Sequence, residues 1–258
     1  MASSPTDFPP LFFKSHDGLD LAYRVVGEGR PFVLIHGLFS NAWTNWIRYG
    51  HAQVIAEAGF RVIMPDLRGH GSSAAPHDPE HYPADILAAD GEALVRHLGL
   101  GDHDLGGYSL GGRTVLRMLV RGARPRRAVL SGMGLDGILH TGKRQGFFRH
   151  VLTGIGTHAR GSAAWMAEAF LKTTGGDPQA MLPLLDSFAD TSPGELAQVE
   201  TPALVLSGRD DHDNGSAAEL ARALGNATLV EITGNHMTAV LQPALGQAIR
   251  AFLTEIDS

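Results

Sequence analysis

Short apolar runs rich in β-branched residues alternate along this chain with longer amphipathic stretches. Strands separated by helices pair in parallel, because each helix returns the chain across one face of the sheet. The alternation predicts an α/β fold, with a mostly parallel sheet between two layers of helices and ligands at the carboxyl ends of the strands. The strand-like runs cover residues 19–27, 30–37, 61–67, 126–134, 202–211 and 227–234, and the helical patterns cover residues 41–58, 83–98, 110–121, 216–224 and 237–256.

One segment interrupts this alternation. Between Leu135 and Gln198 no run is typical of a strand, and the apolar residues fall into amphipathic, helix-like stretches. The segment follows the strand that ends at Ser131, so it leaves the sheet at the ligand end. We predict a core formed by residues 1–134 and 199–258, with residues 135–198 as a helical cap insertion over the pocket.

Composition narrows the classes of protein to consider. The chain has 258 residues, of which 43% are hydrophobic and 19% charged, as in an ordinary globular domain with a sizeable core. It has no cysteine, which excludes disulfides and thiolate chemistry, and its net charge of -6 offers no basic surface for nucleic acid. No stretch approaches the roughly 20 apolar residues of a membrane span, and the N-terminus has no signal-peptide pattern. A cytoplasmic location is expected.

A serine stands among glycines in "GGYSLGG", residues 106–112, between a strand ending at Gly107 and a helix beginning near Leu110. Such a sharp strand-to-helix turn needs small residues on both sides, because side chains there would clash. The pattern Gly107-Tyr108-Ser109-Leu110-Gly111 is that of a nucleophile elbow, with the positive end of a helix directed at the serine.

A serine hydroxyl is a weak nucleophile that needs a base, and the base needs an acid to orient it. Asp211 lies just past a strand-like run, in "SGRDD", and His236 follows the last strand-like run, in "TGNHM". Both groups therefore belong to loops at the edge of the sheet where Ser109 is expected. We predict Ser109 as nucleophile, His236 as base and Asp211 as acid.

Two further motifs join these three. "HGLFSN", residues 36–41, follows an apolar run, and "PDLRGHGSS" occupies residues 65–73. Together the ordered motifs resemble the α/β-hydrolase superfamily of serine hydrolases, with an esterase-like pattern and a small helical cap, over residues 19–253. The resemblance implies an eight-stranded sheet, and it implies the backbone N–H groups of Leu38 and Leu110 as the oxyanion hole.

The identity of the acid is less constrained than that of the serine. Asp210 and Asp213 share the loop with Asp211, and Asp136 follows the strand at which some relatives place their acid. The resemblance favours Asp211, which stands at the family's usual offset after Gly208. A metal site in "DDHDN", residues 210–214, is disfavoured because the spacing fits neither a calcium loop nor a zinc site.

Several other features have simpler interpretations. Trp43, Tyr108, Phe147 and Trp165 are the residues expected to contact substrate, because they lie beside the elbow, in the loop after Leu38, or in the cap. The run "GDHDLGG" before the elbow is polar, which predicts a weak contribution to the core. For His103 and Asp104 it favours a local hydrogen-bonded pair or a strand end that reaches solvent over a second functional pair. Finally, arginines at four-residue intervals after the elbow predict a solvated helix face, at Arg113, Arg117 and Arg121.

The predicted chemistry is acyl transfer from a small or medium, mainly apolar carboxylic ester to water, through an acyl-enzyme and without cofactor or metal. Carbon–carbon bond hydrolysis, lactone opening, perhydrolysis and acyl transfer to an alcohol use the same groups and stay open. Relatives that act as dehalogenases or epoxide hydrolases carry aspartate at the elbow, so Ser109 disfavours those reactions. A triad-bearing ligand-binding protein with little turnover is the alternative outside enzymology.

Overall fold

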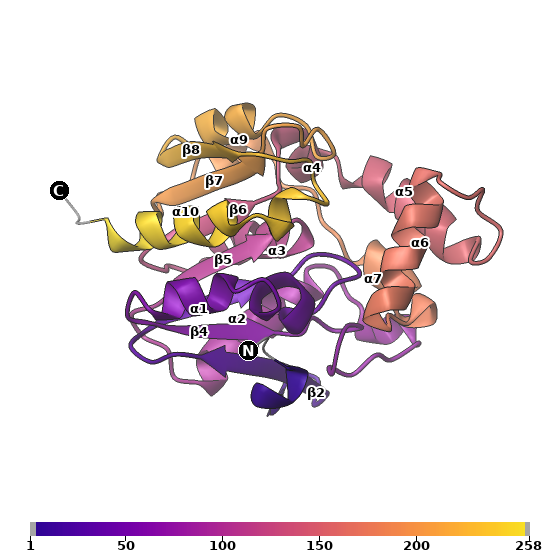
Figure 1. Ribbon diagram of the computed structural model, residues 1–258, viewed down its shortest axis with the longest axis horizontal. Coiled ribbons are helices and arrows are strands. Elements are labelled where there is room, and N and C mark those ends of the chain that lie inside the picture. The colour runs from indigo at the N-terminus through magenta and orange to yellow at the C-terminus, as the bar shows by residue number, and fades with distance from the viewer. Residues whose placement is uncertain (1–3, 256–258) are drawn as a thin grey trace.

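The computed structural model describes residues 4–255 and contains an eight-stranded sheet with the order β1-β2-β4-β3-β5-β6-β7-β8 (Figure 1). The pairs β1–β2 and β2–β4 are antiparallel and all the others are parallel, which confirms the predicted fold class. The strands are β1 (Leu11–Lys14), β2 (Asp20–Val26), β3 (Arg30–Ile35), β4 (Phe60–Pro65), β5 (Asp104–Tyr108), β6 (Ala128–Ser131), β7 (Ala203–Gly208) and β8 (Ala227–Ile232).

Helices cover both faces of the sheet. Along β3, Val33 and Ile35 join the cluster on one face, whereas Phe32 and Leu34 join the cluster on the other. Alternate side chains of a strand point to opposite faces, so a strand buried on both sides is apolar throughout. The first face carries α2 (Ile86–His97), α3 (Leu110–Val120) and α9 (Ala217–Leu224), and the second carries α1 (His51–Ala56) and α10 (Pro243–Thr254).

Two predicted helices are shorter than their patterns suggested. The stretch 41–58 forms a π-helical turn, Trp43–Ile47, and then α1, separated by Gly50 with a φ of 79°. The stretch 237–256 forms a 3-10 turn, Ala239–Leu241, before α10, and residue 256 lies outside the described residues. Strand β1 was not among the predicted runs, because its four residues are too few to show a period.

Strand β5 corrects the expectation that the polar run before the elbow adds little to the core. All five of its residues are buried, and it lies between β3 and β6. The ring of Phe32 fills the space beside Gly106, where an added Cβ would lie 2.6 Å from the ring. Asp104 is fully buried, and its carboxylate forms an ion pair at 2.8 Å with Nε of Arg30.

His103 and Asp104 therefore do not pair with each other. The ring of His103 donates instead from Nδ1 to the carbonyl of Gly101 at 2.9 Å. Burial is the largest influence on Asp104 and raises the pKa of its carboxyl to about 6, although Arg30 acts in the opposite direction. The ion pair between Arg30 and Asp104 lies where β3 and β5 begin, at the opposite end of the strands from Ser109.

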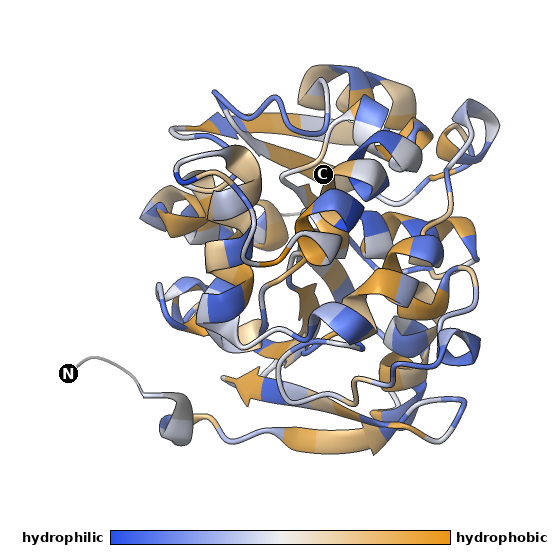
Figure 2. Cartoon of the chain, turned by 90° about the vertical axis from the view of Figure 1, so that its right-hand side faces the viewer, coloured by the Kyte–Doolittle hydropathy of each residue, from blue (hydrophilic) through white to orange (hydrophobic). Residues whose placement is uncertain are grey.

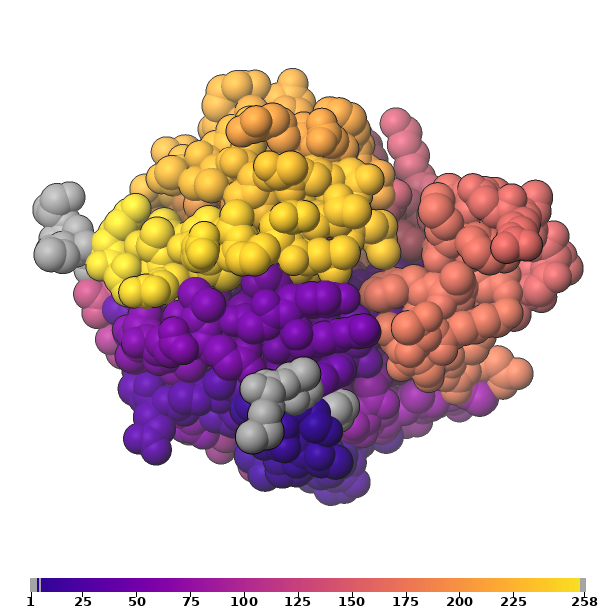
Figure 3. Space-filling model, viewed as in Figure 1, coloured from indigo at the N-terminus to yellow at the C-terminus, as the bar shows by residue number. Residues whose placement is uncertain are grey.

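Residues 135–198, called the helical insertion below, contain no strand in the structure. Helices α4 and α8 contact α9 of the core, whereas α5, α6 and α7 pack on one another and form a lobe beside the sheet (Figures 1 and 3). Seen from that side in Figure 2, the sheet strands are mostly hydrophobic, and the helices in front carry both kinds of residue. The helices are α4 (Leu135–Leu139), α5 (Thr141–Thr153), α6 (Ala163–Thr174), α7 (Pro178–Asp186) and α8 (Pro193–Leu196).

Candidate active site

The turn between β5 and α3 holds Ser109 in an unusual backbone conformation. Its φ is 53° and its ψ is -116°, and its N–H donates to the carbonyl of Ser131 at 2.8 Å. A Cβ on Gly107 would lie 2.2 Å from the carbonyl carbon of Gly111, and one on Gly111 would lie 2.1 Å from the carbonyl oxygen of Ile35. The glycines therefore allow α3 to begin directly against the sheet, which leaves the Ser109 side chain at the strand end.

Ser109, His236 and Asp211 form a continuous hydrogen-bonded row. Nε2 of His236 lies 3.0 Å from Oγ of Ser109, and Nδ1 lies 2.8 Å from Oδ2 of Asp211. A carboxylate accepts hydrogen bonds, so the imidazole proton is on Nδ1 and Nε2 is free to accept from the serine hydroxyl. The side chains of His236 and Asp211 are largely buried, which fixes this tautomer and keeps the row away from competing water.

The other acidic residues considered from the sequence lie elsewhere. The Asp136 side chain, on α4, is 70% exposed and lies 4.0 Å from Nδ1 of His140. Asp213 forms an ion pair with Arg144 at 3.3 Å, while its N–H donates to Oδ1 of Asp211 at 3.2 Å. In this geometry the imidazole of His236 is oriented by Asp211.

The loop after β3 lies beside the serine and contains one backbone N–H without a partner among the described residues. The N–H of Gly37 donates to Oδ1 of Asn45 at 3.1 Å, and the N–H of Phe39 donates to Nε2 of His70 at 3.2 Å. Between them the N–H of Leu38 has no hydrogen-bond partner among residues 4–255. A Cβ on Gly37 would lie 3.3 Å from Cβ of Ser109, so this loop passes close to the nucleophile position.

His36 and His70 support this loop as neutral side chains. His36 accepts from the N–H of Leu67 at 2.9 Å, and His70 donates from Nδ1 to the carbonyl of Arg68 at 3.0 Å. Burial, together with the neighbouring His36, lowers the pKa of His70 to about 3, and burial also lowers the pKa of His36. Only a neutral imidazole accepts a hydrogen bond, so these pKa shifts preserve the loop at neutral pH.

Phe39 connects this loop to the helical insertion, a role that no pattern in the sequence indicated. Its φ is 62°, and its carbonyl accepts from Oγ1 of Thr174, at the end of α6, at 2.6 Å. Its ring meets the ring of Phe148 edge-on, with 5.3 Å between centroids, inside the apolar cluster of the insertion. Leu38 thus lies one residue from a junction between core and insertion.

The four predicted contact residues have different surroundings. The buried Tyr108 hydroxyl donates to the carbonyl of His236 at 2.6 Å, and burial raises its pKa, so that hydroxyl is occupied by the protein. Trp43 is half-buried against the core cluster beneath α1 and α10. Phe147 packs in the insertion beside Phe148, while Trp165, on α6, is 38% exposed. Tyr108 and Trp43 therefore support the site from the core, and the other two belong to the insertion.

The arginines of α3 correct the prediction of a solvated face. Arg113 is only 8% exposed, and Arg117 forms an ion pair with Asp85 in which Nη2 lies 2.6 Å from Oδ2. Arg121 pairs with Glu92 at 2.7 Å and is the most exposed of the three. The arginines at this four-residue spacing therefore lie on a helix face that is largely covered by α2 and the insertion, and the solvent reaches mainly its far end, at Arg121.

Neither a metal-binding cluster nor a membrane-spanning helix is found in the described part of the chain. Residues 4–255 contain no group of three or more histidine, cysteine, aspartate or glutamate side chains arranged to hold a metal ion. The same residues contain no helix that combines the length and the apolar character needed to cross a bilayer.

Comparisons with known proteins agree with this architecture. A family model described as "alpha/beta hydrolase fold" matches residues 30–148. A non-heme haloperoxidase from Rhodococcus erythropolis is 39% identical over 128 residues, 47% of this chain and 43% of the relative. This chain aligns with less than half the length of the first curated relatives.

Solved structures match over nearly the whole chain. The bromoperoxidase from Bacillus anthracis superposes with a TM-score of 0.73 at 25% identity, covering 96% of this chain and 100% of that chain. A thermophilic esterase from Thermogutta terrifontis gives 0.77 at 23% identity, covering 95% and 98%. The eight-stranded sheet, its strand order and these matches together show that this chain has the α/β-hydrolase fold.

Proposed function

We propose that this chain is a serine hydrolase that cleaves a small or medium, mainly apolar carboxylic ester through an acyl-enzyme. The observation that carries the proposal is the row Ser109–His236–Asp211, with 3.0 Å and 2.8 Å between successive partners. The hydrolase fold supports a hydrolytic reaction, and relatives of this fold include a structure named as an esterase.

In the proposed reaction Nε2 of His236 takes the hydroxyl proton as Oγ of Ser109 attacks the ester carbonyl carbon. Asp211 holds the imidazole in the required tautomer and stabilises its positive charge after the transfer. His236 then donates the proton to the departing alcohol, which leaves the acyl group on Ser109. Water attacks this acyl-enzyme with His236 as base, and the acid product leaves.

The developing oxyanion needs donors that point at it before the reaction begins. The N–H of Leu38, which has no partner among residues 4–255, and the N–H of Leu110, at the start of α3, are the proposed donors. The N–H groups on both sides of Leu38 are occupied by Asn45 and His70, which limits rotation of that peptide. Preorganised donors of this kind contribute about 10²–10³ in kcat each.

We also propose that the helical insertion, residues 135–198, acts as the cap that shapes the acyl pocket. Its apolar cluster includes Phe39 of the loop beside Leu38, so the insertion and the proposed oxyanion hole share a packed boundary. Turnover across a panel of p-nitrophenyl esters, lactones and aromatic diketo acids is the measurement that separates ester hydrolysis from lactone opening and carbon–carbon bond hydrolysis, and chain-length preference among the esters tests the cap.

A fluorophosphonate tests the central claim without knowledge of the substrate. We expect intact-mass analysis to show one adduct per chain on the native protein and none on Ser109→Ala, whose turnover of p-nitrophenyl esters should fall by about 10⁴–10⁶. Ser207→Ala is the matched control, because that buried hydroxyl bonds only the carbonyl of Gly208. A native protein that stays unlabelled and inactive on the panel would favour a ligand-binding role.

A further inference from the structure

Arg113 is a buried cation that lacks a carboxylate partner. It is 8% exposed, and among residues 4–255 no carboxylate oxygen lies within ion-pair distance of its guanidinium, although Asp190 acts on it from farther away. Other arginines inside the core are compensated: Arg68 pairs with Asp90 at 2.8 Å, and Arg24 with Asp66 at 2.9 Å. A buried charge without a counter-ion is costly, so Arg113 needs a reason to be there.

The contacts of Arg113 leave part of its hydrogen-bonding capacity unused. Nη2 donates to the carbonyl of Gly137 on α4, and the guanidinium lies 5.5 Å from the ring of Phe188. Nη1 is buried and has no hydrogen-bond partner within the described range, residues 4–255. Burial lowers the pKa of Arg113 to about 10, so the group is still cationic at neutral pH.

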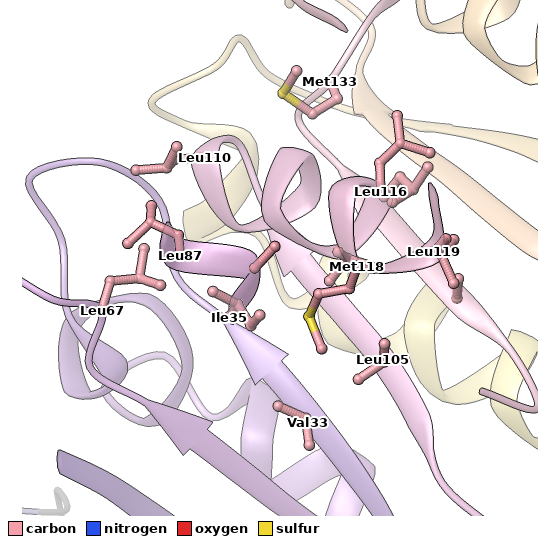
Figure 4. Close-up of a cluster of buried hydrophobic side chains, with 14 of the residues drawn as sticks. Val33, Ile35, Leu67, Leu87, Leu105, Leu110, Leu116, Met118, Leu119 and Met133 are labelled. Atoms are coloured by element: carbon pink, nitrogen blue, oxygen red, sulfur yellow. The ribbon is translucent and has the colours of Figure 1, made fainter. Parts of the chain in front are cut away.

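The guanidinium lines a narrow pocket where α2, α3 and the segment after α7 meet. Ser187, Phe188 and Ala189 form the wall from the insertion, and Leu87 and Leu110 belong to the core wall. Figure 4 shows Leu110 at the start of α3 with Leu87 close to it. Arg117 and Asp85 also line the pocket and pair with each other. Asp190 acts on Arg113 from beyond ion-pair distance, so Arg113 supplies the pocket with a guanidinium that has no direct carboxylate partner among residues 4–255.

The pocket adjoins the proposed oxyanion hole. Leu110 lines the pocket with its side chain and is the proposed donor through its N–H, and Arg113 lies one helical turn after Ser109, with its N–H bonded to the carbonyl of that serine. Four residues of helix span about 6 Å. We take an acyl chain of about two to four carbons beyond the carbonyl, comparable with this rise, as the length to test.

We propose that this pocket is a subsite for a carboxylate carried by the acyl chain of the substrate, with Nη1 of Arg113 as its donor. The proposal rests on the proposed ester hydrolysis and extends it to an ester whose apolar chain ends in a carboxylate. A guanidinium suits this ligand because its N–H groups match the two oxygens of a carboxylate. The pocket has room for little more than a water molecule, so the proposal requires a wall residue, for which we name Phe188, to move aside when the carboxylate enters.

The test compares two esters of equal acyl length, monoethyl glutarate and ethyl valerate, followed by proton release. In Arg113→Met we expect the ratio of kcat/KM for the charged ester to that for the neutral ester to fall at least about 10-fold. Arg113→Lys, which keeps the charge, should recover part of the ratio. Arg121→Gln removes a charge from the same helix outside the pocket and should leave the ratio within about 2-fold.

Calorimetry separates the subsite from the reaction. Monoethyl glutarate should bind to Ser109→Ala at least about 10-fold more tightly than to Ser109→Ala/Arg113→Met. Equal affinities, or an unchanged ratio in Arg113→Met, would overturn the subsite even if the native protein hydrolyses both esters. Arg113-dependent binding without any hydrolysis by the native protein would retain the subsite and reject the ester reaction instead. Melting temperatures verify folding, and Arg113→Gln replaces the methionine variant if that one does not fold.

Discussion

The candidate catalytic row and the helical insertion are held in place by different kinds of interaction. Ser109, His236 and Asp211 are fixed by directional hydrogen bonds from loops that end parallel strands. The lobe of the insertion is held by an apolar cluster that includes the fully buried Leu185, while Met166 on α6 is 56% exposed. Hydrogen bonds fix angles and apolar packing fixes volume, so we expect the row to determine rate and the insertion to determine which acyl groups fit.

These two regions meet at Phe39. Its N–H is bound by His70 of the core and its carbonyl by Thr174 of the insertion. Leu38, the proposed oxyanion donor, precedes it in the chain. A change in the insertion can therefore reach the catalytic groups through one peptide, and the predictions below measure how far the two regions are independent.

The largest effect is expected from the acid. Asp211→Asn should reduce turnover by about 10⁴, because an asparagine amide can favour the wrong imidazole tautomer, while the melting temperature changes little. Asp213→Asn and Asp136→Asn are matched controls on exposed carboxylates and should retain near-native turnover. Steady-state kinetics measures the turnover of each variant. A severe loss of turnover in Asp136→Asn would mean that Asp136, and not only Asp211, orients His236 during the reaction.

The second effect tests the support of the oxyanion loop from the core. His70→Phe keeps the size of the ring but removes the acceptor for the N–H of Phe39, so we expect kcat to fall by about 10–10² and KM to change less. His77→Phe is the control, because His77 is exposed and pairs only with Asp177. Native kcat in His70→Phe would show that Thr174 and packing suffice to hold the loop.

A third variant tests how much the apolar cluster of the insertion contributes to stability. Leu185→Ala leaves a cavity in the cluster of the insertion and should lower the free energy of unfolding by about 2–5 kcal/mol. Leu241→Ala removes the same atoms from a side chain that is 42% exposed, and should cost far less. Denaturant titration gives both values. A large loss of kcat with unchanged stability in Leu185→Ala would contradict the division between the two regions.

The sequence predicted the strands and helices that have a clear apolar period. It also predicted the three candidate catalytic residues, because a serine nucleophile needs a base and an acid beside it. Alternating apolar runs located seven of the strands, counting β5 from the elbow, and the order Ser109, Asp211, His236 was enough to nominate the row. Strand β1 was missed because it is a short edge strand. The helix expected over residues 41–58 was too long, because the pattern does not show that Gly50 takes a positive φ.

The apolar periodicity of the sequence could not predict which charged side chains are buried. Arg113 and Arg121 occur at the same helical spacing, yet one is 8% exposed and the other is accessible on the surface. The difference depends on segments distant in sequence, Gly137 and Phe188, that cover Arg113. Asp104 is a similar case, since its partner Arg30 comes from another strand and only the register of the sheet brings them together.

Asp104 provides a fourth prediction, on stability alone. Its carboxyl has a pKa of about 6 in the folded chain, above the usual value of 3.8, so the folded state holds its proton more tightly than the unfolded state. The free energy of unfolding should therefore fall by roughly 2–3 kcal/mol from this group as pH rises from about 4 to about 6. Asp104→Asn should remove that decline, whereas Asp102→Asn should keep most of it, because the exposed Asp102 is the smallest of the influences on the pKa of Asp104. Denaturant titrations at several pH values test this, and parallel profiles for all three proteins would refute it.

The smallest effect is expected at the surface of the insertion. Trp165 is 38% exposed on α6, so Trp165→Ala should lower the free energy of unfolding by only about 1–2 kcal/mol, less than the loss at the fully buried Leu185. If this indole borders the entrance to the acyl pocket, its removal should still shift the preference between short and long p-nitrophenyl esters severalfold. Phe148→Ala is the informative partner, because its ring packs on Phe39 at 5.3 Å and its loss should reduce stability as well as alter preference. An unchanged preference in both variants would assign acyl selection to the loop after β3, at Leu38 and Trp43, and would make the insertion a packing element only.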